Sequence, residues 1–100
     1  MIQDRFYGML GITAKAGAAA SGAYAATAAV KEGKAFLLIA AADASEQTRA
    51  DYEKLCAGYG VAFAVYGTME QLGSAIGKGS RAVVAVTDER LAENLLSKIS

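Results

Sequence analysis

The sequence predicts an α/β protein built as a three-layer α-β-α sandwich around a central mixed sheet. Three short apolar runs predict strands: "FLLIAA" from Phe36, "VAFAVY" from Val61 and "AVVAV" from Ala82. The segments around these runs space their apolar residues as one face of a helix does. Because strands separated by helices pack between helical layers, we expect one sheet covered on both sides. A chain of 100 residues is expected to form a single domain, residues 1–100.

The first helix is predicted by apolar residues that fall on one helical face: Ile2, Phe6, Met9, Leu10 and Thr13. Gly17 is expected to end this helix. A second helix is expected to begin with Ser21 as its N-cap and to end at Gly33. Between Lys15 and Lys31 the chain carries no charged side chain, so the front of the second helix is unusually apolar.

A third helix is predicted from Ser45, which is suited to an N-cap and is followed by Glu46 in the first turn. Its apolar face is expected to hold five residues: Thr48, Tyr52, Leu55, Cys56 and Tyr59. Because free cysteine usually packs as a small hydrophobe, we expect Cys56 to be a buried structural thiol.

Two further helices are predicted toward the C-terminus. Thr68 and Gln71 form a capping-box pattern, which indicates a short helix ending near Gly77. Asp88 is suited to cap the last helix. Three apolar residues of that helix share a face: Leu91, Leu95 and Ile99.

The composition excludes several classes of chemistry. Ten basic residues balance ten acidic residues, so any basic patch must be local. The absence of histidine excludes the common zinc sites and Ser-His or Cys-His catalysis. The single cysteine, Cys56, excludes an internal disulfide. We therefore predict no catalytic residues, no metal site and no cofactor, and we do not expect an enzyme.

The apolar segments also bear on cellular location. The N-terminal stretch "MIQDRFYGMLG" carries charges at Asp4 and Arg5 and has no long apolar core, so it does not resemble a signal peptide. No apolar run approaches the ~20 residues that a membrane-spanning helix needs. We expect a cytoplasmic protein with no membrane partner.

The stretch "GSAIGKGS" does not have the spacing of a phosphate-binding P-loop, and it follows a helix rather than a strand. A glycine-rich exit from a short helix is the stronger interpretation. Nevertheless, Lys78, Ser80 and Arg81 concentrate two positive charges and a hydroxyl in one loop, which can hold a phosphate backbone.

Two other side chains have competing interpretations. Asp43 follows the first predicted strand, but no acidic cluster beside it supports a Mg²⁺ site. An Asx-type turn before Ser45 is therefore the favoured interpretation. Tyr24 stands in an otherwise alanine-rich helix, where it either stacks on a nucleic-acid base or covers a seam between helices.

Taken in order, these segments resemble the kink-turn RNA-binding family of small ribosomal proteins, which includes the large-subunit proteins "seven-Ae" and "thirty-e". They are most similar to its short bacterial YlxQ-type members. Three stretches carry the resemblance: "GMLGITAKAG", "SGAYAATAAVKEGKAFLLIAAADAS" and, most specifically, "YGTMEQLGSAIGKGSRAVVAVTDE". The resemblance covers nearly the whole chain and implies an α-β-α sandwich that binds structured RNA without catalysis.

The resemblance also implies where the RNA lies. In the family it contacts the start of the second helix and the loop before the last strand, here Gly22 onward and Lys78 through Ala82. Free helix amides suit phosphates and base edges, and glycine permits close approach. Together with the candidates above, this gives eight expected RNA-binding residues: Lys15, Ser21, Gly22, Tyr24, Asp43, Lys78, Ser80 and Arg81.

The sequence departs from the family pattern at the usual contact positions. A polar residue, a glutamate and a lysine are replaced by Tyr24, Ala25 and Ala28. Ala18 replaces a lysine, and Ala42 replaces a glutamate. Alanine makes no hydrogen bond to a base edge, so we predict altered or weakened kink-turn recognition. The alternative is an interaction module that kept the fold, lost RNA binding and binds a protein or its own copy through the alanine-rich face.

Overall fold

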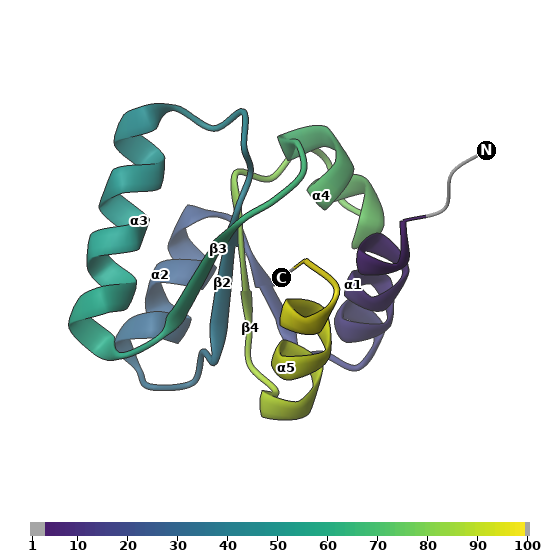
Figure 1. Ribbon diagram of the computed structural model, residues 1–100, viewed down its shortest axis with the longest axis horizontal. Helices are drawn as coiled ribbons and strands as arrows, with labels where there is room; N and C mark the ends of the chain where they lie inside the picture. The colour runs from purple at the N-terminus through teal and green to yellow at the C-terminus, as the bar shows by residue number, and fades with distance from the viewer. Residues whose placement is uncertain (1–3, 100) are drawn as a thin grey trace.

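A four-stranded mixed sheet separates two layers of helices in the computed structural model, which describes residues 4–99 (Figure 1). The five helices are α1 (Arg5–Lys15), α2 (Ala23–Lys31), α3 (Glu46–Tyr59), α4 (Met69–Ala75) and α5 (Glu89–Ser97). The four strands are β1 (Ala19–Ser21), β2 (Leu37–Ala40), β3 (Ala62–Val65) and β4 (Val83–Val86). The predicted three-layer α-β-α sandwich with a mixed sheet is confirmed.

The strands lie in the order β1-β4-β2-β3. β4 runs antiparallel to both of its neighbours, β1 and β2, whereas β3 runs parallel to β2 at the sheet edge. In this register Ser21 faces Val84, and Ala40 faces Val83. The end of β1, the end of β2 and the start of β4 therefore lie side by side at the same end of the sheet.

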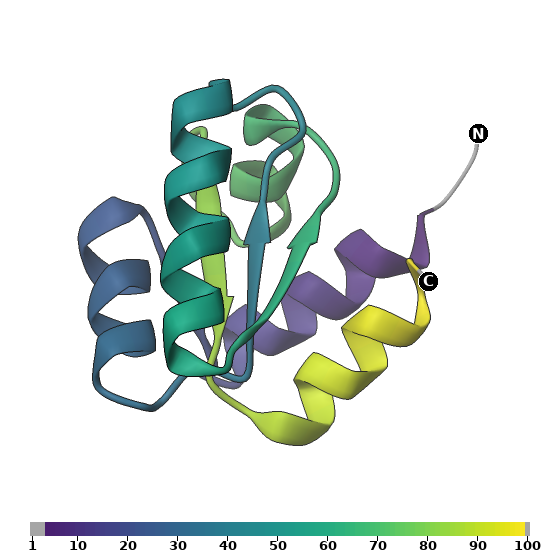
Figure 2. The same cartoon turned by 60° about the vertical axis from the view of Figure 1, so that its left-hand side comes forward.

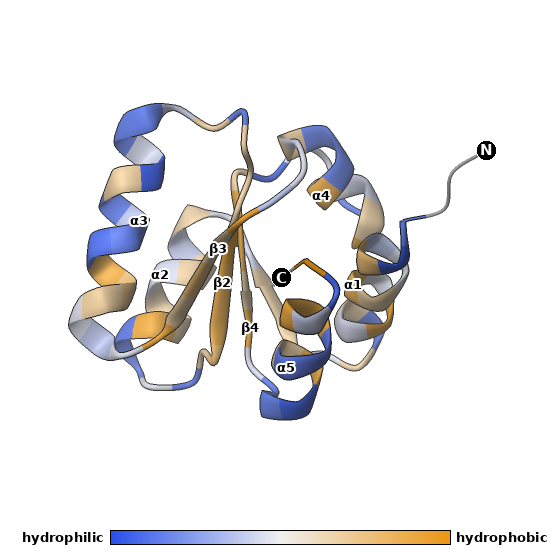
Figure 3. Cartoon of the chain, viewed as in Figure 1, coloured by the Kyte–Doolittle hydropathy of each residue, from blue (hydrophilic) through white to orange (hydrophobic). Residues whose placement is uncertain are grey.

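Two cores form because successive strand residues point to opposite faces. Leu37 and Ile39 of β2 pack with buried residues of α1, α4 and α5, among them Phe6, Leu72 and Leu95. On the other face, residues of α2 and α3 pack against the alternate strand positions: Ala26, Val30 and Cys56 against Leu38, Val83 and Ala85. Figure 2 shows α2 and α3 on one side of the sheet and α1 and α5 on the other. In Figure 3 the hydrophobic colour is strongest on the central strands.

Most helix starts form as predicted. Ser45, Thr68 and Asp88 each accept a backbone N–H hydrogen bond at the start of α3, α4 and α5. Both bonds of the Thr68–Gln71 capping box are present. Cys56 is fully buried, as expected for a structural thiol, and this burial raises the pKa of its thiol.

One strand was not predicted, two expectations about the helices are wrong, and one position lies outside the described residues. The strand β1 was not predicted, because Ala-Ala-Ser has low strand propensity and forms a strand here through its pairing with β4. Since Ser21 ends that strand, Gly22 is the N-cap of α2 in its place. Tyr59 is 52% exposed rather than part of the apolar face of α3. The predicted helical position of Ile2 is not described.

A polar connection joins α1 to the end of β3. Asp4 caps α1 by accepting a hydrogen bond from the Phe6 amide with Oδ1, and its Oδ2 accepts a short hydrogen bond from the Tyr66 hydroxyl. Tyr66 also packs its ring 4.5 Å from the ring of Phe6, measured between centroids. The hydrogen bond to Asp4, with desolvation as a smaller cause, raises the pKa of Tyr66 to about 12.

This raised pKa predicts a pH dependence of stability. Because Tyr66 holds its proton more tightly in the folded chain, the stabilisation is complete below pH 10 and is lost as the pH rises toward 12. We expect Tyr66→Phe to lower the free energy of unfolding at about pH 8, and the deficit relative to the parent to shrink above about pH 10. Urea unfolding at several pH values measures both. Tyr59→Phe, on the surface, is the control, and a deficit independent of pH would contradict the prediction.

Candidate nucleic-acid interface

The start of α2 is shaped by the backbone of Gly22. This residue has φ 90° and ψ 163°, a conformation that side-chain-bearing residues rarely adopt. Its amide donates to the Val83 carbonyl at 3.1 Å, which joins the N-terminus of α2 to β4. No side chain caps the helix, so the amides of its first turn and the positive end of the helix dipole face outward.

Arg81 lies directly beside this helix start. Its Nε donates to the Ser21 hydroxyl at 3.4 Å, and its Nη1 donates to the carbonyls of Gly79 and Ser80 at 3.3 and 3.0 Å. A Cβ atom at Gly22 would lie only 4.0 Å from the Arg81 side chain. These contacts hold a guanidinium at the N-terminus of α2, although the two segments are about 60 residues apart in the chain.

Residues 21–25 and 80–82 together line an open hollow of about 490 Å³. We call these two segments the front face. The front face contains one cation, Arg81, and no acidic side chain. Four of the predicted residues line it in addition to Arg81: Ser21, Gly22, Tyr24 and Ser80. The fold therefore brings together residues from both segments that the sequence indicated.

Tyr24 extends into solvent from the first turn of α2, and 90% of its surface is exposed. The alternative that this ring covers a seam between helices is therefore wrong. Ala23 beside it is exposed, and Ala25 and Ala28 are half-buried. The front face thus presents the exposed ring of Tyr24 beside the methyl groups of Ala23 and Ala25.

Asp43 has a different role from the expected turn. Its Oδ1 accepts a hydrogen bond from the Met69 amide at 2.8 Å, so the carboxylate stabilises the start of α4 rather than forming an Asx-type turn before Ser45. The backbone places Asp43 near the same end of the sheet as the front face, because the Ala41 amide donates to the Ala82 carbonyl at 2.8 Å. However, Asp43 does not line the front-face hollow.

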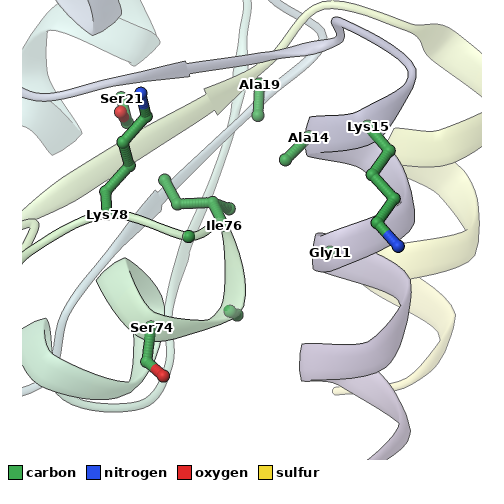
Figure 4. Close-up of a pocket in the computed structure, with 10 residues that line it drawn as sticks. Gly11, Ala14, Lys15, Ala19, Ser21, Ser74, Ile76 and Lys78 are labelled. Carbon is green, nitrogen blue, oxygen red and sulfur yellow. The ribbon is translucent and has the colours of Figure 1, made fainter.

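Lys15 and Lys78 do not line the front-face hollow but a neighbouring one. Lys15 is in the last turn of α1, and Lys78 follows α4. Both line a second hollow of about 630 Å³, together with Ser21 (Figure 4). Ser21 therefore borders both hollows, whereas neither lysine borders the front-face hollow.

Gly73 determines where the loop before β4 can lie, which sequence reasoning did not foresee. The loop backbone crosses over this buried helical glycine so closely that a Cβ atom would lie 1.9 Å from the Gly79 carbonyl oxygen. The Lys78 amide donates to the Gly73 carbonyl at 2.8 Å, and the Arg81 amide donates to the Met69 carbonyl at 3.0 Å. A glycine inside a short helix was the available sequence signal, since glycine there usually has a packing reason.

Within residues 4–99 the chain has neither a metal-binding cluster nor a helix fit to cross a membrane. No group of three or more histidine, cysteine, aspartate or glutamate side chains in this part of the chain is arranged to hold a metal ion. Within the same residues, no helix has both the length and the apolar character needed to cross a lipid bilayer.

Comparison with known proteins identifies the family. The sequence profile of the ribosomal protein L7Ae/L30e/S12e/Gadd45 family matches residues 4–96. The chain belongs to this family. The resemblance inferred from the sequence motifs is thereby confirmed at the level of the family. No curated protein sequence matches the chain.

Solved structures with the same fold include two informative examples. A protein of unknown function from Bacillus halodurans C superposes with a TM-score of 0.92 at 30% identity, covering 97% of this chain and 98% of that one. A 15.5kD RNA binding protein from Giardia lamblia superposes with a TM-score of 0.78 at 24% identity. That match covers 99% of this chain and 88% of the Giardia protein, and it reflects the shared fold.

The position of Gly73 gives a direct test of how the loop is held. We expect Gly73→Ala to displace the loop and to lower the free energy of unfolding by about 1–3 kcal/mol, because the added methyl group has no space. The matched control is Gly58→Ala on α3, where a Cβ atom meets nothing within 4 Å. Urea unfolding and the amide NMR shifts of residues 78–81 measure the two effects. Equal stability of the two variants would refute this view of Gly73.

Proposed function

We propose that the chain is a non-enzymatic, cytoplasmic RNA-binding protein of the ribosomal, kink-turn type, with structured RNA as its partner. Its family supports this proposal, and a protein of the same fold is named as an RNA-binding protein. The observation that carries the proposal is the convergence of the uncapped N-terminus of α2 with the tethered Arg81 in one hollow free of acidic groups.

The front face has the physical features that a nucleic-acid backbone requires. Free amides at a helix N-terminus and a fixed guanidinium both attract phosphate oxygens. The missing side chain at Gly22 permits close approach of a sugar or base edge. The exposed ring of Tyr24 offers a surface for base stacking, which contributes about 1–3 kcal/mol per base in other proteins.

We further propose that recognition of a standard kink-turn is altered or weakened. Ala25 and Ala28 provide no group that can accept from a guanine edge or neutralise a phosphate. Each missing base-edge contact is expected to cost about 1–3 kcal/mol of binding free energy. Any base can stack on Tyr24. Stacking can therefore recover part of the lost binding affinity, but it contributes little to sequence specificity.

The second candidate function is a protein-interaction module that kept the fold and lost RNA binding. The observation that favours it is the exposed Tyr24 among alanines, since exposed tyrosine is enriched in protein interfaces. Titration of the chain with a standard kink-turn RNA at two salt concentrations separates the candidates. RNA binding predicts a saturable complex that salt weakens, whereas the module predicts no complex and self-association or a protein partner instead.

The cations of the loop before β4 provide a prediction about salt. We expect the double variant Lys78→Ala/Arg81→Ala to bind RNA more weakly and to reduce the slope of log affinity against log salt by about one to two units. A charge-matched control is Lys31→Ala/Lys54→Ala, since both lysines are exposed and line neither of the two hollows. Fluorescence anisotropy between about 50 and 200 mM salt measures the slopes. Equal slopes in the two double variants would place the phosphate contacts elsewhere.

The altered contact positions provide a gain-of-function prediction. We expect Tyr24→Asn, Ala25→Glu and Ala28→Lys together to raise kink-turn affinity, by ~2–4 kcal/mol if two base contacts are restored. None of these three positions is fully buried, so larger side chains should fit without overpacking. Circular dichroism checks folding, and anisotropy measures affinity. A folded triple variant that binds no better than the parent would contradict the assigned RNA face and would favour the protein-interaction module.

A further inference from the structure

A second hollow lies beside the front face, between α1 on one side and the C-terminal end of α4 on the other. We call it the α1–α4 cleft, defined by Gly11, Ala14 and Lys15 of α1, Ala19 and Ser21 of β1, and residues 74–78. Its volume of about 630 Å³ falls within the ~300–1,000 Å³ range of small-ligand sites. Apart from Lys15, the residues of α1 and β1 that line the cleft are small, which leaves this space open.

The two helices approach each other closely where Gly11 of α1 meets Ala75 of α4. A Cβ atom on Gly11 would lie 3.0 Å from the Ala75 carbonyl oxygen, so a larger residue there would push the two helices slightly apart. In Figure 4, Lys15 lies on the α1 side of the hollow, whereas Ile76 and Lys78 lie on the other side, after α4. The cleft therefore has an apolar wall and a cation on each side.

The charge of the cleft is entirely positive. Neither lysine is neutralised, because the one ion pair recorded among residues 4–99 joins Lys34 to Glu32. Glu70, one turn earlier on α4, does not line the cleft and instead lines an adjoining hollow that shares Ser74 and Ala75 with it. Two cations and no carboxylate at a concave surface favour an anion.

Hydroxyl groups complete the polar lining. Ser21 accepts a hydrogen bond from Arg81 of the front face, so its own hydroxyl proton remains available to a ligand. Ser74 on α4 is exposed at the opposite side of the cleft. Ser21 thus connects the front face to the cleft, and a chain of phosphates can pass from Arg81 to Lys78 and Lys15.

We propose that the α1–α4 cleft binds a nucleoside phosphate, namely an unpaired nucleotide of the RNA strand that leaves the front face. Lys78 with the Ser21 hydroxyl on one side of the cleft and Lys15 on the other bind successive phosphates of the strand, and Ile76 with the alanine wall contacts the base. This inference rests on the proposed RNA-binding function, and it adds a preference for RNA with a single-stranded extension.

The test compares the affinity of the chain for a blunt kink-turn duplex with its affinity for a set of tailed duplexes. Each tailed duplex carries a single tail of four adenosines, placed at a different strand end. We expect one tail position to raise affinity about 3–10-fold. Lys15→Ala is expected to abolish that gain, so that the tailed and blunt duplexes bind this variant equally, because Lys15 lines the cleft. Lys54→Ala on α3 is the control, and it should retain the gain.

A second variant and a second ligand make the outcome decisive. Ser74→Trp fills the cleft from an exposed helical position, so it should also remove the gain without unfolding the chain. If the blunt duplex binds but no tail adds affinity, or if the gain persists in both variants, the cleft proposal is overturned. If adenosine monophosphate alone binds in a Lys15-dependent way while no tail helps, the cleft serves a free nucleotide, which also overturns it. Failure of every RNA to bind would instead overturn the proposed function.

Discussion

The insertion of β4 between β1 and β2 is the constraint on which the rest of the structure depends. All four residues of β4 are buried, and both neighbouring strands pair with it in antiparallel register. Because antiparallel pairing brings the start of one strand to the end of its partner, the loop before β4 must lie beside the end of β1 and the start of α2. The front face exists for this reason, since its two segments are far apart in the sequence.

Close backbone packing fixes that loop more firmly than its polar bonds do. A hydrogen bond can lengthen by a few tenths of an ångström, whereas the contact of Gly73 with the loop backbone leaves no space for a single methyl group. A milder form of this contact occurs at Gly11, where α1 meets α4 and a Cβ atom would lie 3.0 Å from the Ala75 carbonyl oxygen. Small residues in α4 and α1 thus position both the front face and the cleft without contributing side-chain chemistry of their own.

The balance of charges explains why local geometry matters for binding. With equal numbers of acidic and basic residues, the chain has no long-range attraction for a polyanion. Three cations lie near the proposed RNA path. Arg81 is held by three hydrogen bonds, and Lys15 and Lys78 line the two sides of one cleft. Helix amides add a fixed partial charge that carries no sequence information.

The sequence by itself determined the local features of this protein, because they depend on neighbouring residues. The caps at Ser45, Thr68 and Asp88 and the three apolar strand segments are each recorded in a few adjacent residues. The motifs identified the family. The tertiary structure alone decided what depends on distant contacts. It made a strand of residues 19–21, turned Asp43 toward α4, exposed Tyr24 and placed Lys15 opposite Lys78. Each of these outcomes follows from pairing or packing between segments that no local pattern records.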